Sequence, residues 1–86
     1  MGPKLKIIGT DKNMITQGVL RYKTDDDNWY HLEEIISLIN RKAYTFVVNI
    51  NDFEITLQPK HFKDDKEDKD REVIKIKNFL RNLPEM

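Results

Sequence analysis

Large apolar and polar residues alternate from Ala43 to Gln58, and this pattern predicts a β-hairpin. Asn51 and Asp52 interrupt the alternation, and both residue types tolerate the positive φ of a two-residue primed turn. Such a turn would stack the apolar side chains of both strands on one face of the sheet. The expected pairs are Ile50 with Phe53, Val48 with Ile55 and Phe46 with Leu57.

A different period precedes the hairpin and predicts an amphipathic helix from about Tyr30 to Arg41. Its apolar residues recur at i, i+3, i+4 and i+7, which is the stripe of a helix with one buried face: Leu32, Ile35, Ile36 and Ile39. We expect Asp27 or Asn28 to cap the N-terminus of this helix.

The N-terminal part of the chain predicts a second hairpin. Its strands would run over Leu5–Ile8 and Met14–Tyr22, with Gly9–Asn13 as the turn between them. Gly18 interrupts the second strand and indicates a β-bulge, since one extra residue there would turn the apolar residues on both sides inward.

The C-terminal third is ambiguous in its periodicity. Lys63 to Glu72 is an unbroken run of charged residues, which predicts an exposed or disordered loop at about 62–72. We expect a strand over Val73–Lys77 and a helical turn over Asn78–Asn82, stopped by Pro84. The alternative is a helix, because four apolar residues of this segment recur with a helical period: Val73, Ile76, Leu80 and Leu83.

Together these elements predict one α+β domain over residues 1–86. The expected sheet is small and mainly antiparallel, with four or five strands in the order ββαββ followed by a short strand or helical turn, and one helix packs on one face. A chain of 86 residues buries a small core, so a bound partner or self-association would add useful stability.

Composition narrows the classes of protein further. There is no cysteine, which excludes disulfide frameworks, cysteine nucleophiles and iron–sulfur sites. The sequence also lacks a long apolar run, so we expect neither a signal peptide nor a transmembrane helix. These features favour a cytoplasmic protein that does not act on membranes.

The chain has no net charge, with 15 basic and 15 acidic residues, but the signs are unevenly spread. The first 23 residues hold five cations against Asp11 alone. With Lys75 and Lys77 these cations provide an alternative function, weak binding of nucleic acid. The five are Lys4, Lys6, Lys12, Arg21 and Lys23.

Residue types that carry catalysis or bind metals are present without the spacing that such chemistry needs. An EF-hand loop beginning at Asp25 would need glycine and glutamate where Tyr30 and Ile36 stand. His31 and His61 are read as surface histidines, and the one serine, Ser37, lies on a helix without a nucleophile elbow. The carboxylates of Glu33, Glu34 and Glu54 fall on outward faces. We therefore expect no enzymatic activity, no metal and no cofactor.

The leading hypothesis is a non-enzymatic interaction module that binds another protein or itself. Large aromatic side chains in polar surroundings, Trp29 and Tyr30, are typical of recognition surfaces. Together with Tyr22 and Tyr44, they provide rings that could stack on bases if nucleic acid were the partner. The polar face of the predicted hairpin completes the candidate surface: Thr45, Val47, Asn49, Glu54 and Thr56.

The order of features resembles a family of small bacterial proteins catalogued as domain of unknown function 3892. The matching segments are Ile7-Ile8, Trp29, Glu33 to Ile36 and Phe46 to Val48, and the closest match is Asn78 to Met86. The resemblance implies the architecture of that family and no activity.

A second, shorter likeness covers Gly9 to Gln17, which is similar to a strand-turn segment of a small phage-encoded inhibitor of Cas9. That class of inhibitor imitates DNA with a strongly acidic surface, whereas this chain is neutral. The likeness indicates a phage or mobile-element protein that interacts with its host as a further alternative.

Overall fold

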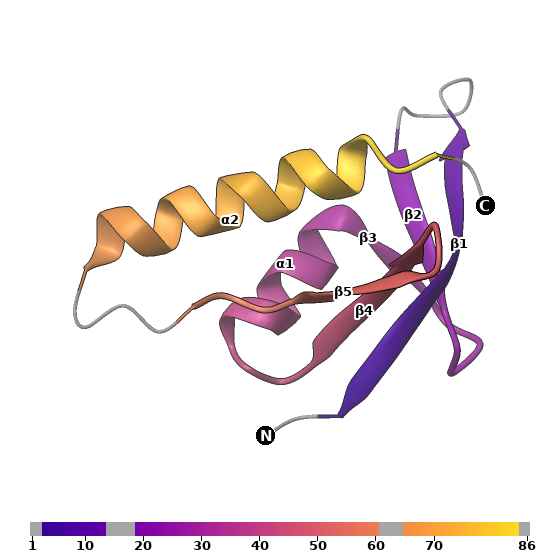
Figure 1. Cartoon of the computed structure of the whole chain (residues 1–86), viewed down its shortest axis with the longest axis horizontal. Helices are drawn as coiled ribbons and strands as arrows, with labels where there is room; N and C mark the ends of the chain where they lie inside the picture. Colours follow the sequence, from indigo (N-terminus) through magenta and orange to yellow (C-terminus); the bar gives the residue numbers. More distant parts are fainter. Residues whose placement is uncertain (1–2, 14–18, 61–64, 85–86) are drawn as a thin grey trace.

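The computed structural model describes residues 3–13, 19–60 and 65–84 and confirms the α+β class. Two helices and a five-stranded, mainly antiparallel sheet make up the fold (Figure 1). The strands are β1 (Lys4–Asn13), β2 (Val19–Thr24), β3 (Trp29–His31), β4 (Thr45–Ile50) and β5 (Phe53–Leu57), and the helices are α1 (Leu32–Asn40) and α2 (Lys66–Arg81).

The strands lie in the order β3-β2-β1-β4-β5, so β1 is the central strand. β1 pairs in parallel with β4, from Lys4 opposite Thr45 to Ile7 opposite Val48, while all other pairs are antiparallel. A parallel pair requires a crossover connection, and β2, β3 and α1 provide it here.

The predicted hairpin over 43–58 is confirmed as β4 and β5 in the expected register. Ile50 pairs with Phe53, and the apolar pairs continue to Phe46 with Leu57. Asn51 and Asp52 have φ values of 49° and 69°, as a primed two-residue turn requires.

The N-terminal hairpin differs from its prediction. Gly9–Asn13, expected as the turn, belongs to the long strand β1, and the connection to β2 falls at 14–18, outside the described residues. The bulge predicted at Gly18 lies there too. The observed irregularity in register lies between Ile7 and Gly9, and it allows both Ile7 and Thr10 to be buried.

Helix α1 carries the predicted stripe, and all four residues of that stripe are buried. The helix begins two residues later than expected because Trp29–His31 pair with β2 as strand β3. The predicted cap at Asp27 or Asn28 is therefore wrong. Residues 25–28 form the β2–β3 turn instead, and the N–H of His31 donates to Glu34 Oε1 at 3.0 Å.

The expected loop at about 62–72 and the expected strand over Val73–Lys77 are wrong from residue 66 onward, where helix α2 runs to Arg81. Opposite charges lie one turn apart on this helix, with Arg71 3.6 Å from Glu67 and 3.5 Å from Asp68. Its second half supplies the apolar stripe of the predicted alternative: Ile76 and Leu80 are buried on the helix, and Leu83 is buried just beyond its end.

Both helices share one core with a single face of the sheet. The cluster of buried residues joins Ile35 and Leu80 of the helices to Ile7, Phe46 and Val48 of the strands. The expected helix–sheet packing is thus correct, with α2 as an additional member. The opposite face of the sheet is not covered by either helix, and we call it the helix-free face.

Candidate interaction surface

The register of the sheet determines which side chains share the helix-free face. Side chains of residues paired across strands point to the same side of a sheet. Lys6 therefore shares a face with Val47 and Thr56, and Lys23 shares a face with Trp29. From β3 to β5 the described side chains of this face are Trp29, His31, Arg21, Lys23, Asp11, Ile8, Lys6, Lys4, Thr45, Val47, Asn49, Glu54 and Thr56.

Trp29 is the largest side chain on this face and remains 44% exposed. The guanidinium carbon of Arg21 lies 5.0 Å from the centre of its ring, and the Lys23 ammonium lies 6.0 Å from it. Arg21 also forms an ion pair with Asp11, and Lys23 lies 3.2 Å from Asp27. The indole is therefore held at the edge of the sheet by two cations, each of which is fixed in turn by an aspartate.

Tyr30 does not join Trp29, although the two were predicted as one patch. Consecutive residues of a strand point to opposite faces, and the Tyr30 ring packs edge-on against Phe46 with 5.9 Å between ring centres. Its hydroxyl donates to Asp26 Oδ2 at 3.1 Å. Burial and this carboxylate raise the pKa of Tyr30.

The run of aspartates organises the β2–β3 turn. Asp26 accepts from the Thr24 hydroxyl, from the side-chain amide of Asn28 at 3.0 Å and from Tyr30. These bonds, led by that of Thr24, lower the pKa of Asp26 against a smaller opposing effect of burial. Asp27 adopts the positive φ of 67° that closes the turn. The aspartates of this run thus have a structural role in forming the turn.

The hairpin residues of the predicted surface lie together, but not beside Trp29. Asn49, Glu54 and Thr56 are exposed, whereas Val47 is only 4% exposed and offers little contact area. Since four inter-strand spacings separate β3 from β5, roughly 19 Å of sheet lies between the two regions. The helix-free face thus has an aromatic, basic region and a polar region.

The cations predicted to form one basic face are also separated in the structure. Lys4, Lys6, Arg21 and Lys23 share the helix-free face, but Lys12 pairs with Leu20 on the opposite side. Lys75 and Lys77 lie on α2, and Lys77 binds Glu33 at 3.3 Å. The cations of the N-terminal strands and those of α2 therefore do not form one patch.

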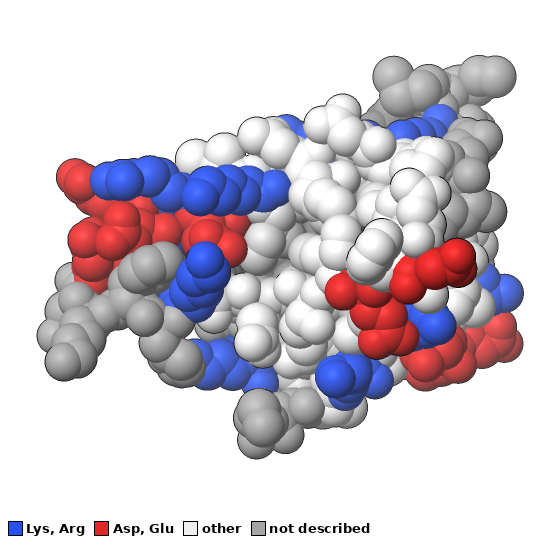
Figure 2. Space-filling view, in the orientation of Figure 1, with Lys and Arg blue, Asp and Glu red and all other residues white. Residues whose placement is uncertain are grey.

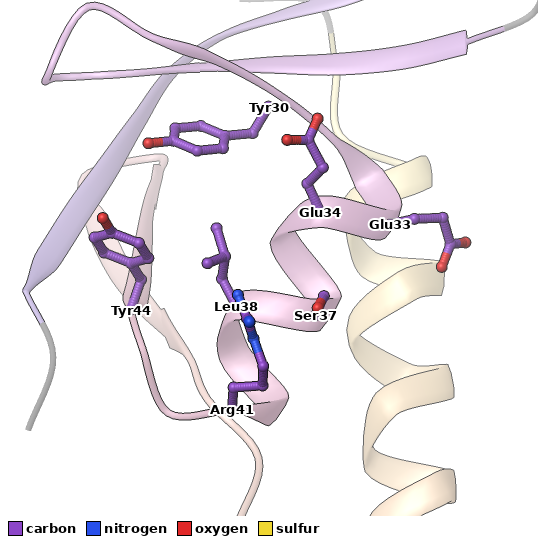
Figure 3. Close-up of a pocket in the computed structure, with 7 residues that line it drawn as sticks. All are labelled: Tyr30, Glu33, Glu34, Ser37, Leu38, Arg41 and Tyr44. Carbon is purple, nitrogen blue, oxygen red and sulfur yellow. The ribbon is translucent and has the colours of Figure 1, made fainter.

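A shallow pocket of about 500 Å³ lies between α1 and the start of β4 (Figure 3). The rings of Tyr30 and Tyr44 and the side chain of Leu38 line its inner side, while Glu33 turns away toward α2. Ser37 is present without a histidine among the lining residues, so the pocket holds no serine–histidine pair. The full lining is Tyr30, Glu33, Glu34, Ser37, Leu38, Arg41 and Tyr44.

Across residues 3–13, 19–60 and 65–84, no three or more histidine, aspartate or glutamate side chains come together in a way that could hold a metal ion. No helix in these ranges is long and apolar enough to cross a membrane. His31 lies exposed on β3, and His61 is outside the described residues.

No family model matches the chain, and no curated protein or solved structure matches it. The assignment of the candidate surface therefore rests on the geometry of this chain alone.

Sequence reasoning missed the roles of Arg21 and Lys23 beside Trp29. Their contact requires β3, a strand of three residues that the helix prediction had partly absorbed. The available signal was the polar turn at 25–28 followed by an aromatic pair, which is typical of a hairpin that returns to pair with β2.

Proposed function

We propose that this protein is a non-enzymatic, cytoplasmic interaction module that binds another protein on its helix-free face. The observation that carries this proposal is the exposed Trp29 beside Arg21. Tryptophan and arginine are the residue types most enriched at the energetic centres of protein interfaces. Ile8, 50% exposed on the neighbouring part of the same face, adds apolar area to the contact.

The position of Trp29 also favours binding. The indole is already held between Arg21 and Lys23, so little side-chain freedom is lost when a partner covers it. The resemblance to domain of unknown function 3892 implies no competing activity. A phage or mobile-element protein that interacts with a host protein is compatible with the same surface.

Affinity capture from an extract of the host cell tests this proposal. We expect Trp29→Ala to lower recovery of the specific partner by roughly tenfold or more, as the loss of a central anchor does. Ile74→Ala is the matched control because Ile74 is 56% exposed on α2, away from the helix-free face. Equal recovery by wild type and Trp29→Ala would contradict the proposal.

Weak binding of single-stranded nucleic acid is the second candidate, and a specific observation favours it. Four cations lie on the same face as Trp29, and a positive surface with an aromatic platform is how such strands are bound without sequence preference. The four are Lys4, Lys6, Arg21 and Lys23.

Trp29 is the only tryptophan, so its fluorescence reports on this candidate directly. If four phosphates are contacted, affinity for a mixed-sequence oligonucleotide should fall several hundredfold between about 20 and about 200 mM salt. Lys6→Glu should weaken binding, whereas Lys75→Glu on α2 should not. An unchanged fluorescence signal at low salt would exclude this function.

A further inference from the structure

Strand β5 forms one edge of the sheet and lacks several of the features that usually protect an edge. Residues 53–57 contain neither proline nor lysine, and the register with β4 runs without a bulge from the turn to Leu57. The opposite edge, β3, is only three residues long. A regular, exposed edge strand is a template on which a further strand can pair.

The hairpin geometry determines which backbone groups this edge offers. In a two-residue hairpin the residues flanking the turn exchange hydrogen bonds, so Phe53, Ile55 and Leu57 direct theirs to β4. The backbone groups of Glu54 and Thr56 consequently point away from the sheet, and Gln58 continues their alternation. Pro59, which has no N–H, falls at an inward position and removes no donor from the edge.

Apolar side chains beside this edge are left uncovered. The helices bury Leu57, which is 5% exposed, but Ile55 is 36% exposed and Phe53 is 74% exposed. Figure 1 shows β5 in front of β4 and below α2. In Figure 2 uncharged surface fills the middle of this side, while charged side chains gather at the N-terminal half of α2 and at the lower right. The edge thus combines free backbone groups with apolar area.

We propose that β5 pairs antiparallel with β5 of a second copy of this chain, in a two-fold register centred on Thr56. The two sheets then become one sheet of ten strands. Ile55 faces the partner's Leu57, and Phe53 faces the partner's Pro59. Both exposed apolar side chains are covered, and the helices of both copies remain on one side because opposed residues share a face.

Charge and apolar contact together distinguish this register from its neighbours. Centring on Glu54 would bring two carboxylates face to face, and like charges directly opposite destabilise a strand pair. Centring on Ile55 would place Asp52 opposite the partner's Gln58 and leave Lys60 beyond the turn, with no acidic residue opposite it. Centring on Leu57 would place Glu54 opposite the partner's Lys60 but would move Phe53 away from the partner's Pro59. The register centred on Thr56 places Asp52 opposite the partner's Lys60 and Glu54 opposite the partner's Gln58, so each acidic side chain faces a cation or an amide.

The contact is small, since two strands of five residues with their flanks bury less than a standard interface. We therefore expect a dimer with a Kd of roughly 10–100 μM. Light scattering across concentration should show the mass rising from the 10.3 kDa of one chain toward twice that value. A chain that remains monomeric at about 1 mM would overturn the proposal.

Charge reversal at the two-fold centre tests the register. Thr56→Lys and Thr56→Glu should each raise the dimer Kd by roughly tenfold or more, because like charges then meet across the axis. An equimolar mixture of the two variants should restore the dimer. Asn49→Lys, an exposed change on β4 of the same face, should leave the Kd unchanged. No recovery in the mixture of folded variants would contradict this register.

Amide hydrogen exchange gives a readout that does not require a variant. The amides of Glu54, Thr56 and Gln58 should become more protected as protein concentration rises, while those of Phe53 and Ile55 should not change. Protection that is independent of concentration would overturn the pairing. Trp29→Ala should leave the dimer intact, which separates this inference from the proposed binding of another protein.

Discussion

At the scale of single residues, Tyr22 joins the sheet to the end of α2. Its ring is buried, and its hydroxyl donates to the carbonyl oxygen of Leu80 at 2.7 Å. Burial raises the pKa of Tyr22 to about 12, against a smaller opposing effect of Arg81. The Tyr22 side chain therefore packs between the sheet and α2, and the ionisation of its hydroxyl makes this contact depend on pH.

The first prediction is a loss of stability in alkali that depends on Tyr22. The unfolded chain releases the phenolic proton near the ordinary pKa of 10.0, whereas the folded chain retains it to about 12. The stabilising contribution is therefore complete below pH 10 and is lost as pH rises through 12, by roughly 2–3 kcal/mol. Urea unfolding at several pH values should show this loss in the wild type and a smaller one in Tyr22→Phe.

The second prediction concerns the β4–β5 turn. Asp52 holds a φ of 69°, a conformation that glycine adopts without the steric cost of a Cβ atom. Asp52→Gly should raise the free energy of unfolding by about 0.5–1 kcal/mol, and Asp52→Val should lower it. Thermal unfolding of the two variants measures both changes. A stabilising valine would show that the turn relaxes to negative φ.

At the scale of elements, α2 is fixed at its two ends by different means. Asp65 accepts hydrogen bonds from the N–H groups of Glu67 and Asp68, at 3.0 and 3.3 Å. The bond from Asp68 is the larger cause of a lowered pKa at Asp65. The other end is held by Tyr22 and by the Thr10 hydroxyl, which donates to the Pro84 carbonyl at 3.2 Å.

The third prediction follows from this asymmetry. Asp65→Ala should fray the first turns of α2 and leave the core folded, since the buried residues lie in the second half of the helix. Amide exchange should accelerate several-fold at 67–69 and remain unchanged at Leu80. Because the folded pKa of Asp65 is lowered, the cap is present above the ordinary carboxyl pKa and is lost as pH falls below it. Asp65→Ser should retain the cap.

Elements defined by nearby residues could be predicted from the sequence. The alternation over 43–58 contains both strands and their turn, and the stripe of α1 lies within nine residues. The first half of α2 was missed, and the second half was kept only as an alternative, because the first turns bury nothing and are held by a cap and by pairs such as Glu67–Arg71. Strand β3 was missed because three residues carry too little periodicity.

At the scale of the whole molecule, stability depends on the apolar half of α2. A domain of 86 residues has roughly 4–13 kcal/mol of net stability. The fourth prediction is that Leu80→Ala costs roughly 2–5 kcal/mol, because Leu80 is fully buried in the shared core. Urea unfolding should separate this variant clearly from Ile74→Ala, which changes an exposed side chain and should lie close to the wild type.

The residues of the candidate surface could be brought together only once the order of the strands in the sheet was known. Sequence alternation placed Thr45, Asn49 and Thr56 on one face of a hairpin, and the structure keeps them together. It could not place Lys6 and Trp29 on that same face, because the order of strands depends on pairing between distant segments. Adjacent residues were grouped instead, which is why Tyr30 was assigned to the surface.

The parallel pairing of β1 with β4 imposes an order of events on folding. β1 is made first, yet its second neighbour is completed only when residues 45–48 are available. A nascent chain shorter than this has a central strand with one side unpaired and a helix α1 that lacks β4, one of the strands it packs against. Contacts that span so much sequence slow folding. The middle of the sheet is thus completed only after β2, β3 and α1 have been made, although its first strand emerges before all the others.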